Sequence, residues 1–302
     1  MAAAAPSARV FGLLVVRDAA DLIRANVLHH LGLGLERLLV LDNGSGDGTQ
    51  DRLRRLARTL PIELEIDDGP FEHAAFVNRL ADRARAAGAD WLLPIDADEF
   101  FVAAEPLPGL LGRSDAGALR IEVVNFVQRH RRRTPSERTL LTMDHRPAHT
   151  IPQPEARYHV AAGEWSLVEV AWQPKVVVRA AGRAWIHTGS HGVDDPPGPV
   201  EATDRIVCLD APLRDRSRIE GRIEHGRRHE AAGAPGDTGW QSQDLGLAGD
   251  TKTLWRANSN RRGAIVVGGE RRALVRDPRL RELAAPHVPG RFAAAIARLR
   301  GA

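Results

Sequence analysis

The chain has 302 residues, 43% of them hydrophobic, which is enough for a sizeable buried core and excludes a disordered or fibrous polypeptide. The formal charge is only +3 although 42 residues are basic; these are dispersed and almost all arginine, so we expect no nucleic-acid partner. A single cysteine, Cys208, excludes an intrachain disulfide and favours a reducing, cytoplasmic setting. No apolar run approaches the roughly 18 residues of a membrane span and no leader pattern is present, so we expect no integral membrane segment.

The N-terminal third alternates apolar strands with amphipathic helices. In chain order we expect a strand at 10–16, a helix at 19–31, a strand at 37–41, a helix carrying Leu53, Leu56 and Leu60, a strand at 62–66, a helix at 73–87 and a strand at 91–95. This order predicts an α/β fold with a doubly wound, mostly parallel sheet. In such sheets ligands bind beyond the carboxyl ends of the strands.

After residue 105 the alternation weakens, so we expect an α/β domain at 1–125 and a second, smaller region with the C-terminal helices at 126–302. The later segments are predicted as strands at 118–126, 166–172 and 175–180, extended loops at 129–157 and 189–199, a partly helical stretch at 206–229 and a C-terminal helix at 291–300.

Three carboxylates end the apolar strand at 91–95, namely Asp96, Asp98 and Glu99. Burying charge is costly unless a cation or hydrogen-bond donors meet it. Side chains two positions apart in an extended segment point the same way, so Asp96 and Asp98 can converge on one Mg²⁺ or Mn²⁺. Such an ion usually shares its remaining positions with water and phosphate oxygens. The sequence therefore predicts a divalent-metal site at the end of this strand.

Three motifs, each following a predicted strand, resemble those of the family-2 glycosyltransferases: Val15-Val16-Arg17-Asp18, Leu41-Asp42-Asn43-Gly44-Ser45-Gly46-Asp47-Gly48-Thr49 and Ile95-Asp96-Ala97-Asp98-Glu99-Phe100. The second and third match the subgroup with Asp-Asn-Gly-Ser-x-Asp-Gly-Thr and Asp-x-Asp-Glu-Phe. The resemblance covers residues 10–105 and implies a GT-A-like fold that binds a nucleotide-diphosphate sugar. It also implies a bridging divalent ion and inverting transfer of the sugar to an acceptor hydroxyl.

The resemblance assigns roles where the residues match. Asp42 would hydrogen-bond the nucleotide's base or ribose, and Arg17 and Asp18 would flank the base, although the family more often has Asn-Glu after the arginine. Asp98 would contact the metal directly. Asp96 would contact the donor's ribose or sugar together with the metal shell.

Other polar residues have two interpretations each. Asn43 and the residues to Thr49 either contact the nucleotide or form the turn and cap the next helix. Asn78 faces the cleft or is an ordinary polar helix residue. Lys175 meets a phosphate or lies at a strand edge. Either His187 or His191 completes the metal shell, or both are hydrogen-bonded loop histidines.

An inverting transfer also needs a base for the acceptor hydroxyl, and in the family this is an acid about 60 to 100 residues after the metal-binding acids. The candidates in this window are Glu155, Glu164, Glu169, Asp194 and Asp195. Asp194 and Asp195 lie in a Gly/Pro-rich loop that could cover a cleft, and they lead this group together with Glu164.

Two alternatives belong to other functional classes. A sugar nucleotidyltransferase would need a Gly-rich basic loop after the first strand, which Val16-Arg17-Asp18-Ala19 does not supply. A non-catalytic nucleotide-sugar-binding protein is less consistent with the complete pair of Asp96 and Asp98. Five of the six tryptophans fall in the second half and favour an acceptor site there. We expect a UDP- or GDP-linked donor and a small-molecule or envelope-glycan acceptor; the cluster Arg129-His130-Arg131-Arg132-Arg133 is either a solvated loop or a patch for phosphate or an acidic acceptor.

Overall fold

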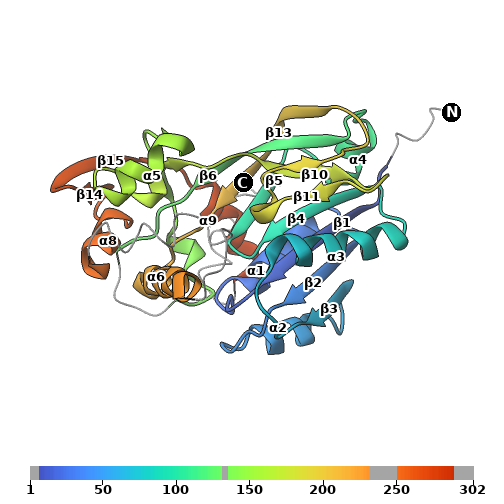
Figure 1. The fold of residues 1–302 in the computed structure, drawn as a ribbon, viewed down its shortest axis with the longest axis horizontal. Coiled ribbons are helices and arrows are strands. Elements are labelled where there is room, and N and C mark those ends of the chain that lie inside the picture. Colours follow the sequence, from blue (N-terminus) through green and yellow to red (C-terminus); the bar gives the residue numbers. More distant parts are fainter. Residues whose placement is uncertain (1–6, 131–134, 232–249, 289–302) are drawn as a thin grey trace. The chain divides into compact units, whose positions relative to one another are not determined.

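The computed structural model describes residues 7–130, 135–231 and 250–288 (Figure 1). The chain divides into two compact units: unit 1 consists of Met1–Val123 with Gln173–Leu209, and unit 2 of Val124–Trp172 with Asp210–Ala302. The helix predicted at 291–300 lies outside the described residues. Among the residues described, no helix is both long and apolar enough to cross a bilayer.

Unit 1 is built on an eight-stranded sheet with the order β3-β2-β1-β4-β10-β6-β13-β5. The strands β3, β2, β1 and β4 are mutually parallel, whereas β10 runs antiparallel to both β4 and β6. Their bounds are β1 Val10–Val16, β2 Arg37–Asp42, β3 Ile62–Ile66, β4 Trp91–Asp96, β5 Glu99–Ala103, β6 Ala118–Asn125, β10 Lys175–Arg179 and β13 Val200–Asp210. The α/β fold class is thereby confirmed, with a parallel part followed by a mixed part.

Helices cover both faces of the parallel part, because successive residues of β1 point to opposite sides. On one side Val10, Leu14 and Val16 pack with Ile23 of α1 and Leu53 of α2. On the other side Phe11, Leu13 and Val15 pack with Phe76, Val77 and Leu80 of α3. The helices of this unit are α1 Ile23–Gly32, α2 Thr49–Leu56, α3 His73–Ala86 and α4 Leu107–Gly112. The sheet is therefore doubly wound, as predicted.

Unit 2 has its own apolar core under a three-stranded sheet of order β14-β15-β7. Its elements include β7 His145–Pro147, α5 Gln153–Ala161, α6 Arg216–Ala231, α8 Thr251–Ala257, β14 Ala264–Val267, β15 Glu270–Arg276 and α9 Arg279–Ala284. Buried Leu254 and Trp255 of α8 pack with Ile265 and Val267 of β14 in this core.

The sequence predictions fail where pairing with distant segments decides the structure. The stretch predicted as helical from 206 begins as the end of β13, whose Ile206 and Cys208 are buried, and α6 starts only at Arg216. The strand predicted at 166–172 is a 3₁₀ turn at Leu167–Glu169 followed by the two-residue strand β9 Val170–Ala171. The loop predicted at 129–157 contains β7 and the start of α5. Tertiary context overrides local propensity at all three places.

Candidate active site

The three motif loops of unit 1 follow strands that end side by side. In the sheet register Val16 of β1 is paired with Asp42 of β2, and Val15 is paired with Asp96 of β4. Because the strands are parallel, their carboxyl ends lie at one edge, where ligands of doubly wound sheets bind. The structure therefore brings Arg17, Asp18, Asp42 and Asp96 to one edge of the sheet.

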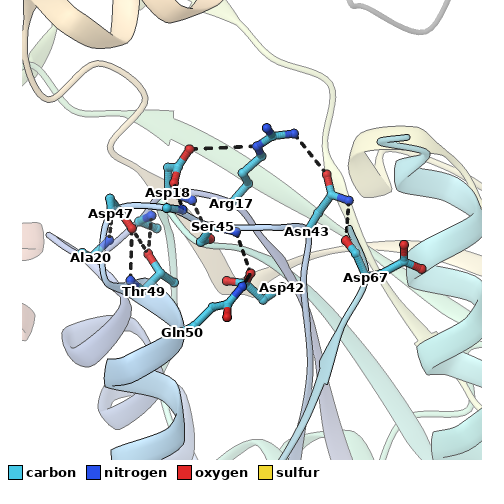
Figure 2. Close-up of polar contacts among 12 residues, drawn as sticks. Arg17, Asp18, Ala20, Asp42, Asn43, Ser45, Asp47, Thr49, Gln50 and Asp67 are labelled. Atoms are coloured by element: carbon cyan, nitrogen blue, oxygen red, sulfur yellow. Dashed lines mark hydrogen bonds and ion pairs between the residues drawn. The ribbon is translucent and has the colours of Figure 1, made fainter. Parts of the chain in front are cut away.

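The loop after β2 is hydrogen-bonded to the loop after β1 (Figure 2). The backbone N–H of Asp18 donates to Ser45 Oγ at 2.9 Å, and Gly46 N–H donates back to Asp18 Oδ1 at 2.8 Å. Asp47 Oδ2 accepts from Ala20 N–H at 3.0 Å, and Asp47 Oδ1 accepts from Thr49 N–H at 3.1 Å. These bonds favour the turn-forming interpretation of the residues from Ser45 to Thr49.

Asn43 makes an equivalent connection to the loop after β3. Its Nδ2 donates to the carbonyl oxygens of Asp67 at 2.8 Å and Gly69 at 2.9 Å. Its Oδ1 is 3.4 Å from Nη1 of Arg17, whose side chain is otherwise half-exposed and 3.9 Å from Asp18 Oδ2. Asn43 therefore positions the loops, while Arg17 is left at the open edge.

Asp42 differs from these neighbours because only one of its carboxylate oxygens is used. Oδ1 accepts from Ser45 N–H at 2.8 Å and from Gln50 Nε2 at 2.9 Å. The described residues supply no donor to Oδ2, which is buried. A buried acceptor without a partner is costly, so this oxygen is suited to receive a hydrogen bond from a ligand.

A charged cluster follows β4. Lys175 is buried, and its ammonium donates to Asp96 Oδ2 at 2.8 Å and to the Gly189 carbonyl at 2.6 Å, and forms an ion pair with Glu99 Oε1 at 2.6 Å. Burial opposes the charge of Asp96, but the charge of Lys175 and the hydrogen bond with His73 hold the pKa of Asp96 well below its usual range. Burial likewise opposes the charge of Lys175, but Asp96 and Glu99 raise its pKa above the ordinary lysine value.

The sequence leaves a phosphate contact and a strand-edge position open for Lys175, and in the structure its ammonium group makes its contacts within the protein. An ammonium group has three hydrogens, and Asp96, Glu99 and Gly189 provide three acceptors. Lys175 belongs to the site, but it acts as a counter-ion for the acidic turn.

His73, which the sequence analysis did not single out, is buried at the start of α3 beside this cluster. Gly189 N–H donates to His73 Nδ1 at 3.1 Å, so the proton of the neutral ring lies on Nε2, 3.4 Å from Asp96 Oδ1. The signal that could have revealed His73 is a polar residue opening a helix that follows a strand of the parallel sheet.

Asn26 of α1 was also missed, although a buried asparagine in an apolar helix is an informative signal. Its Nδ2 lies 3.2 Å from the carbonyl oxygen of Asp96, 3.1 Å from that of Ala97 and 2.8 Å from that of Glu99. His30, one turn later on α1, accepts from the N–H of Phe101. Two side chains of α1, Asn26 and His30, thus hydrogen-bond the backbone between Asp96 and Phe101.

His191 lies close enough to Asp96 and Lys175 for their charges to affect the pKa of its ring. Burial, followed by the positive charge of Lys175, lowers the pKa of His191 to about 4, so the ring is neutral at pH 7. Its Nδ1 is 2.9 Å from the Gln173 carbonyl, which can only accept, so Nε2 carries the lone pair of the neutral ring. A neutral imidazole with a free Nε2 is a competent metal ligand.

A pocket of about 420 Å³ lies beside the hairpin β11 Trp185–Ile186 and β12 Val193–Asp194, and Trp185, His187 and His191 are among its lining residues. Trp185 is half-exposed. His187 Nε2 is 2.9 Å from Asp194 Oδ1, and Asp194 is exposed. Asp195 follows it, also exposed, with a φ of 49°.

The side chains of Asn78 and Glu164 form hydrogen bonds within the protein. Asn78 is buried on α3, where Nδ2 donates to the carbonyls of Ala74 at 2.8 Å and Ile186 at 2.7 Å, so a nucleotide contact by this amide would break a bond that holds β11. Glu164 lies in unit 2, where Oε2 is 2.6 Å from His159 Nδ1.

The residues present fit a metal ion that is shared with a substrate better than one held by protein alone. Within the described ranges, no group of three or more His, Cys, Asp or Glu side chains could hold a metal. Mg²⁺ and Mn²⁺ bound with phosphates commonly take only one or two protein ligands. Asp98 lies on the turn after β4, and His191, whose ring is close to Asp96, has a second potential donor atom in Nε2.

Comparison with protein-family models and with curated proteins finds no match. Among solved structures, a mannosyltransferase from Pyrobaculum calidifontis in complex with GDP-Man and Mn²⁺ is 16% identical, with 98% of this chain and 81% of that chain covered and a TM-score of 0.42. TarS of S. aureus, residues 1–349, is 10% identical, with 80% and 70% covered and a TM-score of 0.39. A complex of the same protein with UDP has a TM-score of 0.38 at 11% identity and the same coverage. Since these TM-scores are below 0.5, we base the functional proposal on this chain's own residues.

Proposed function

We propose that the protein is a glycosyltransferase that moves a sugar from a nucleotide-diphosphate sugar to an acceptor hydroxyl with inversion. The observation that carries this proposal is the position of Asp42 and Asp96 at the ends of β2 and β4, the two parallel strands that flank β1, each followed by a loop that matches a glycosyltransferase motif. One end of the edge has a buried acceptor at Asp42, and at the other end the turn after β4 carries Asp96 and Asp98.

In this proposal the nucleotide lies across the ends of β1 and β2. The unpartnered Oδ2 of Asp42 accepts an N–H or O–H of the base or ribose, and Arg17, half-exposed at the end of β1, flanks the base. Asp18 is already hydrogen-bonded to the loop after β2, so it shapes the pocket wall. Recognition of the nucleotide would then depend on Asp42 and Arg17, which lie on the hydrogen-bonded loops after β2 and β1.

Asp98 and His191 would hold Mg²⁺ or Mn²⁺ at the other end of the edge, with Asp96 beside them. When bound, such an ion stabilises the negative charge that grows on a departing nucleoside diphosphate. Lys175 keeps Asp96 ionised and neutralises part of the charge of the acidic turn. His73 fixes the orientation of Asp96 from the other side.

The acceptor would lie in the pocket next to the β11–β12 hairpin, with the exposed ring of Trp185 as a stacking surface for a sugar. We propose Asp194 as the base that takes the proton of the acceptor hydroxyl, since its partner His187 lines this pocket. Asp195 is the neighbouring alternative.

Binding of UDP-, GDP- and dTDP-sugars, measured by thermal shift and calorimetry with and without Mn²⁺, tests the proposal. Asp42→Asn keeps Oδ1 for Ser45 and Gln50 but replaces Oδ2 by a donor, so nucleotide affinity should fall about tenfold or more while folding is retained. Asp98→Asn should remove the Mn²⁺-dependent part of binding. Asp51→Asn, an exposed position on α2, is the control.

A transfer assay then separates binding from chemistry. Asp194→Asn should bind the donor as the wild type does and lose transfer, whereas Glu164→Gln should retain both. The proposal is wrong if no nucleotide sugar stabilises the protein, or if Asp42→Asn and Asp98→Asn bind donors normally.

A further inference from the structure

Unit 2 contains a second pocket, of about 820 Å³, that the proposed transfer reaction does not use. Its described lining is rich in basic side chains, namely the guanidinium groups of Arg129, Arg261, Arg262 and Arg271 and the imidazoles of His130 and His145. No aspartate or glutamate is among the described residues that line it. A pocket with this composition attracts anions, because four guanidinium charges are gathered in one concavity whose described lining contains no carboxylate.

The turn that carries Arg261 and Arg262 is fixed on both sides. Asn260 N–H donates to the Gln128 carbonyl at 2.7 Å, and the Asn260 carbonyl accepts from His130 N–H at 2.8 Å. Asn260 Oδ1 also accepts from Gly263 N–H at 2.8 Å. The two arginines therefore project from a held backbone, and a ligand would not have to order this turn on binding.

Arg262 has a φ of 57°, in the left-handed region that a non-glycine residue rarely occupies. Such a conformation is strained for an ordinary side chain. The next residue, Gly263, also has positive φ, at 77°. Arg262 is thus held in a conformation that glycine or asparagine adopts with less strain.

Opposite this turn, Arg271 of β15 is the register partner of Val266 of β14, and both line the pocket. Nη2 of Arg271 donates to the Arg261 carbonyl at 3.5 Å, and among the described residues no carboxylate forms an ion pair with Arg261, Arg262 or Arg271. The N–H donors of these three guanidinium groups are therefore not occupied by acidic side chains of the described residues.

The buried carboxylate of Asp144 contacts two arginines and a histidine, of which Arg129 and His145 line the pocket. Asp144 Oδ2 is 3.2 Å from Nη2 of Arg129 and 3.1 Å from Nη1 of Arg281, and Oδ1 is 2.9 Å from Nδ1 of His145. Asp144 therefore positions Arg129 and His145 at the pocket, and its single negative charge is shared between Arg129 and Arg281. The pocket retains a positive charge.

We propose that this pocket of unit 2 binds a phosphate ester. Guanidinium groups bind tetrahedral oxyanions through paired N–H donors. The four arginines that line the pocket carry more positive charge than the single carboxylate of Asp144 can neutralise. A phosphate monoester carries about −1.5 to −2 at pH 7. The volume exceeds what a free phosphate ion fills, so the ester's polar body occupies the remainder.

Calorimetry with glucose 6-phosphate as the probe tests the proposal, at constant ionic strength, in EDTA and without nucleotide. These conditions keep the result independent of the proposed donor site. The wild type should bind glucose 6-phosphate saturably, more tightly than inorganic phosphate or glucuronate, and should not bind glucose. The double variant Arg261→Gln/Arg262→Gln should bind at least about tenfold more weakly, as expected for the loss of charge-assisted hydrogen bonds.

The matched control is Arg256→Gln on α8, an exposed arginine of the same unit outside the described lining, which should change the affinity less than twofold. Thermal unfolding of each variant without ligand confirms that the fold is intact. Absence of saturable binding by the wild type, or wild-type affinity in the double variant, would overturn the site. Glucuronate or inorganic phosphate binding as tightly as glucose 6-phosphate would overturn the assignment to a phosphate ester.

Discussion

Replacing Lys175 by methionine removes the ammonium group that lies between Asp96 and Glu99 while keeping a side chain of similar length. The ammonium nitrogen is 2.8 Å from Asp96 Oδ2 and 2.6 Å from Glu99 Oε1. At an effective dielectric constant near 20, each contact is worth about 6 kcal/mol of Coulomb attraction before the cost of desolvation. Removing one partner from a buried ion pair typically destabilises a protein by about 3–5 kcal/mol, and we expect a loss in this range for Lys175→Met at pH 8.

The size of this loss should depend on pH. In the variant, two carboxylates face one another in a largely buried site, which raises the pKa of at least one of them above its unfolded value. An acid whose folded pKa is raised destabilises the fold above that pKa and ceases to do so when it is protonated. The difference between wild type and Lys175→Met should therefore be largest at pH 8 and shrink toward pH 5. In the wild type, the lowered pKa of Asp96 keeps its favourable contribution intact across this window.

Urea denaturation at pH 5 and pH 8 measures both effects. Lys252→Met, which changes the chain's other lysine at an exposed position of α8, is the matched control and should leave stability unchanged. Adding Glu99→Gln to Lys175→Met should recover part of the loss, because it removes one of the two facing charges. A Lys175→Met variant as stable as the wild type at pH 8, or one whose deficit is the same at both pH values, would refute this reasoning.

Two further predictions concern the supports of the site. Asn26→Leu leaves the carbonyls of the turn at Asp96, Ala97 and Glu99 without their buried donor, so the free energy of unfolding should fall by about 2–4 kcal/mol in urea denaturation; a change below about 1 kcal/mol would contradict the role of Asn26. His191 should titrate near pH 4 in an NMR pH series. Because its folded pKa is below the unfolded value, the unfolded chain binds the proton first, and stability should decline from about pH 6.5 to about pH 4. His191→Gln should lessen this decline, and an equal decline in both proteins would argue against the burial of the ring.

The parallel half of unit 1 could be predicted from sequence because its signals are local. The strands at Val10–Val16 and Ile62–Ile66 have the predicted limits, since each is a short apolar run between polar segments. The ends of parallel strands also place their following residues together by topology alone, which explains why Asp42 and Asp96 were expected at one site.

The contacts that give each site residue its role could not be predicted, because they join distant segments. Lys175 and Asp96 are 79 positions apart, and Gly189 and His73 are 116 apart. No spacing rule relates them, so the sequence indicated either a phosphate contact or a strand-edge position for Lys175 and gave no role to His73. Asn78 is a similar case, because its partner Ile186 lies 108 residues away.

Gly189 connects several parts of this cluster through its backbone alone. Its N–H donates to His73, its carbonyl accepts from Lys175, and a Cβ at this position would lie 2.9 Å from Cδ2 of the His191 ring. An amide hydrogen in a loop normally exchanges with solvent quickly, but this one is held by a buried imidazole. The hydrogen-exchange rate of the Gly189 amide therefore reports whether the contact between Gly189 and His73 in the charged cluster is intact. That rate would allow donor or metal binding to be followed without placing any label on a side chain that takes part in it.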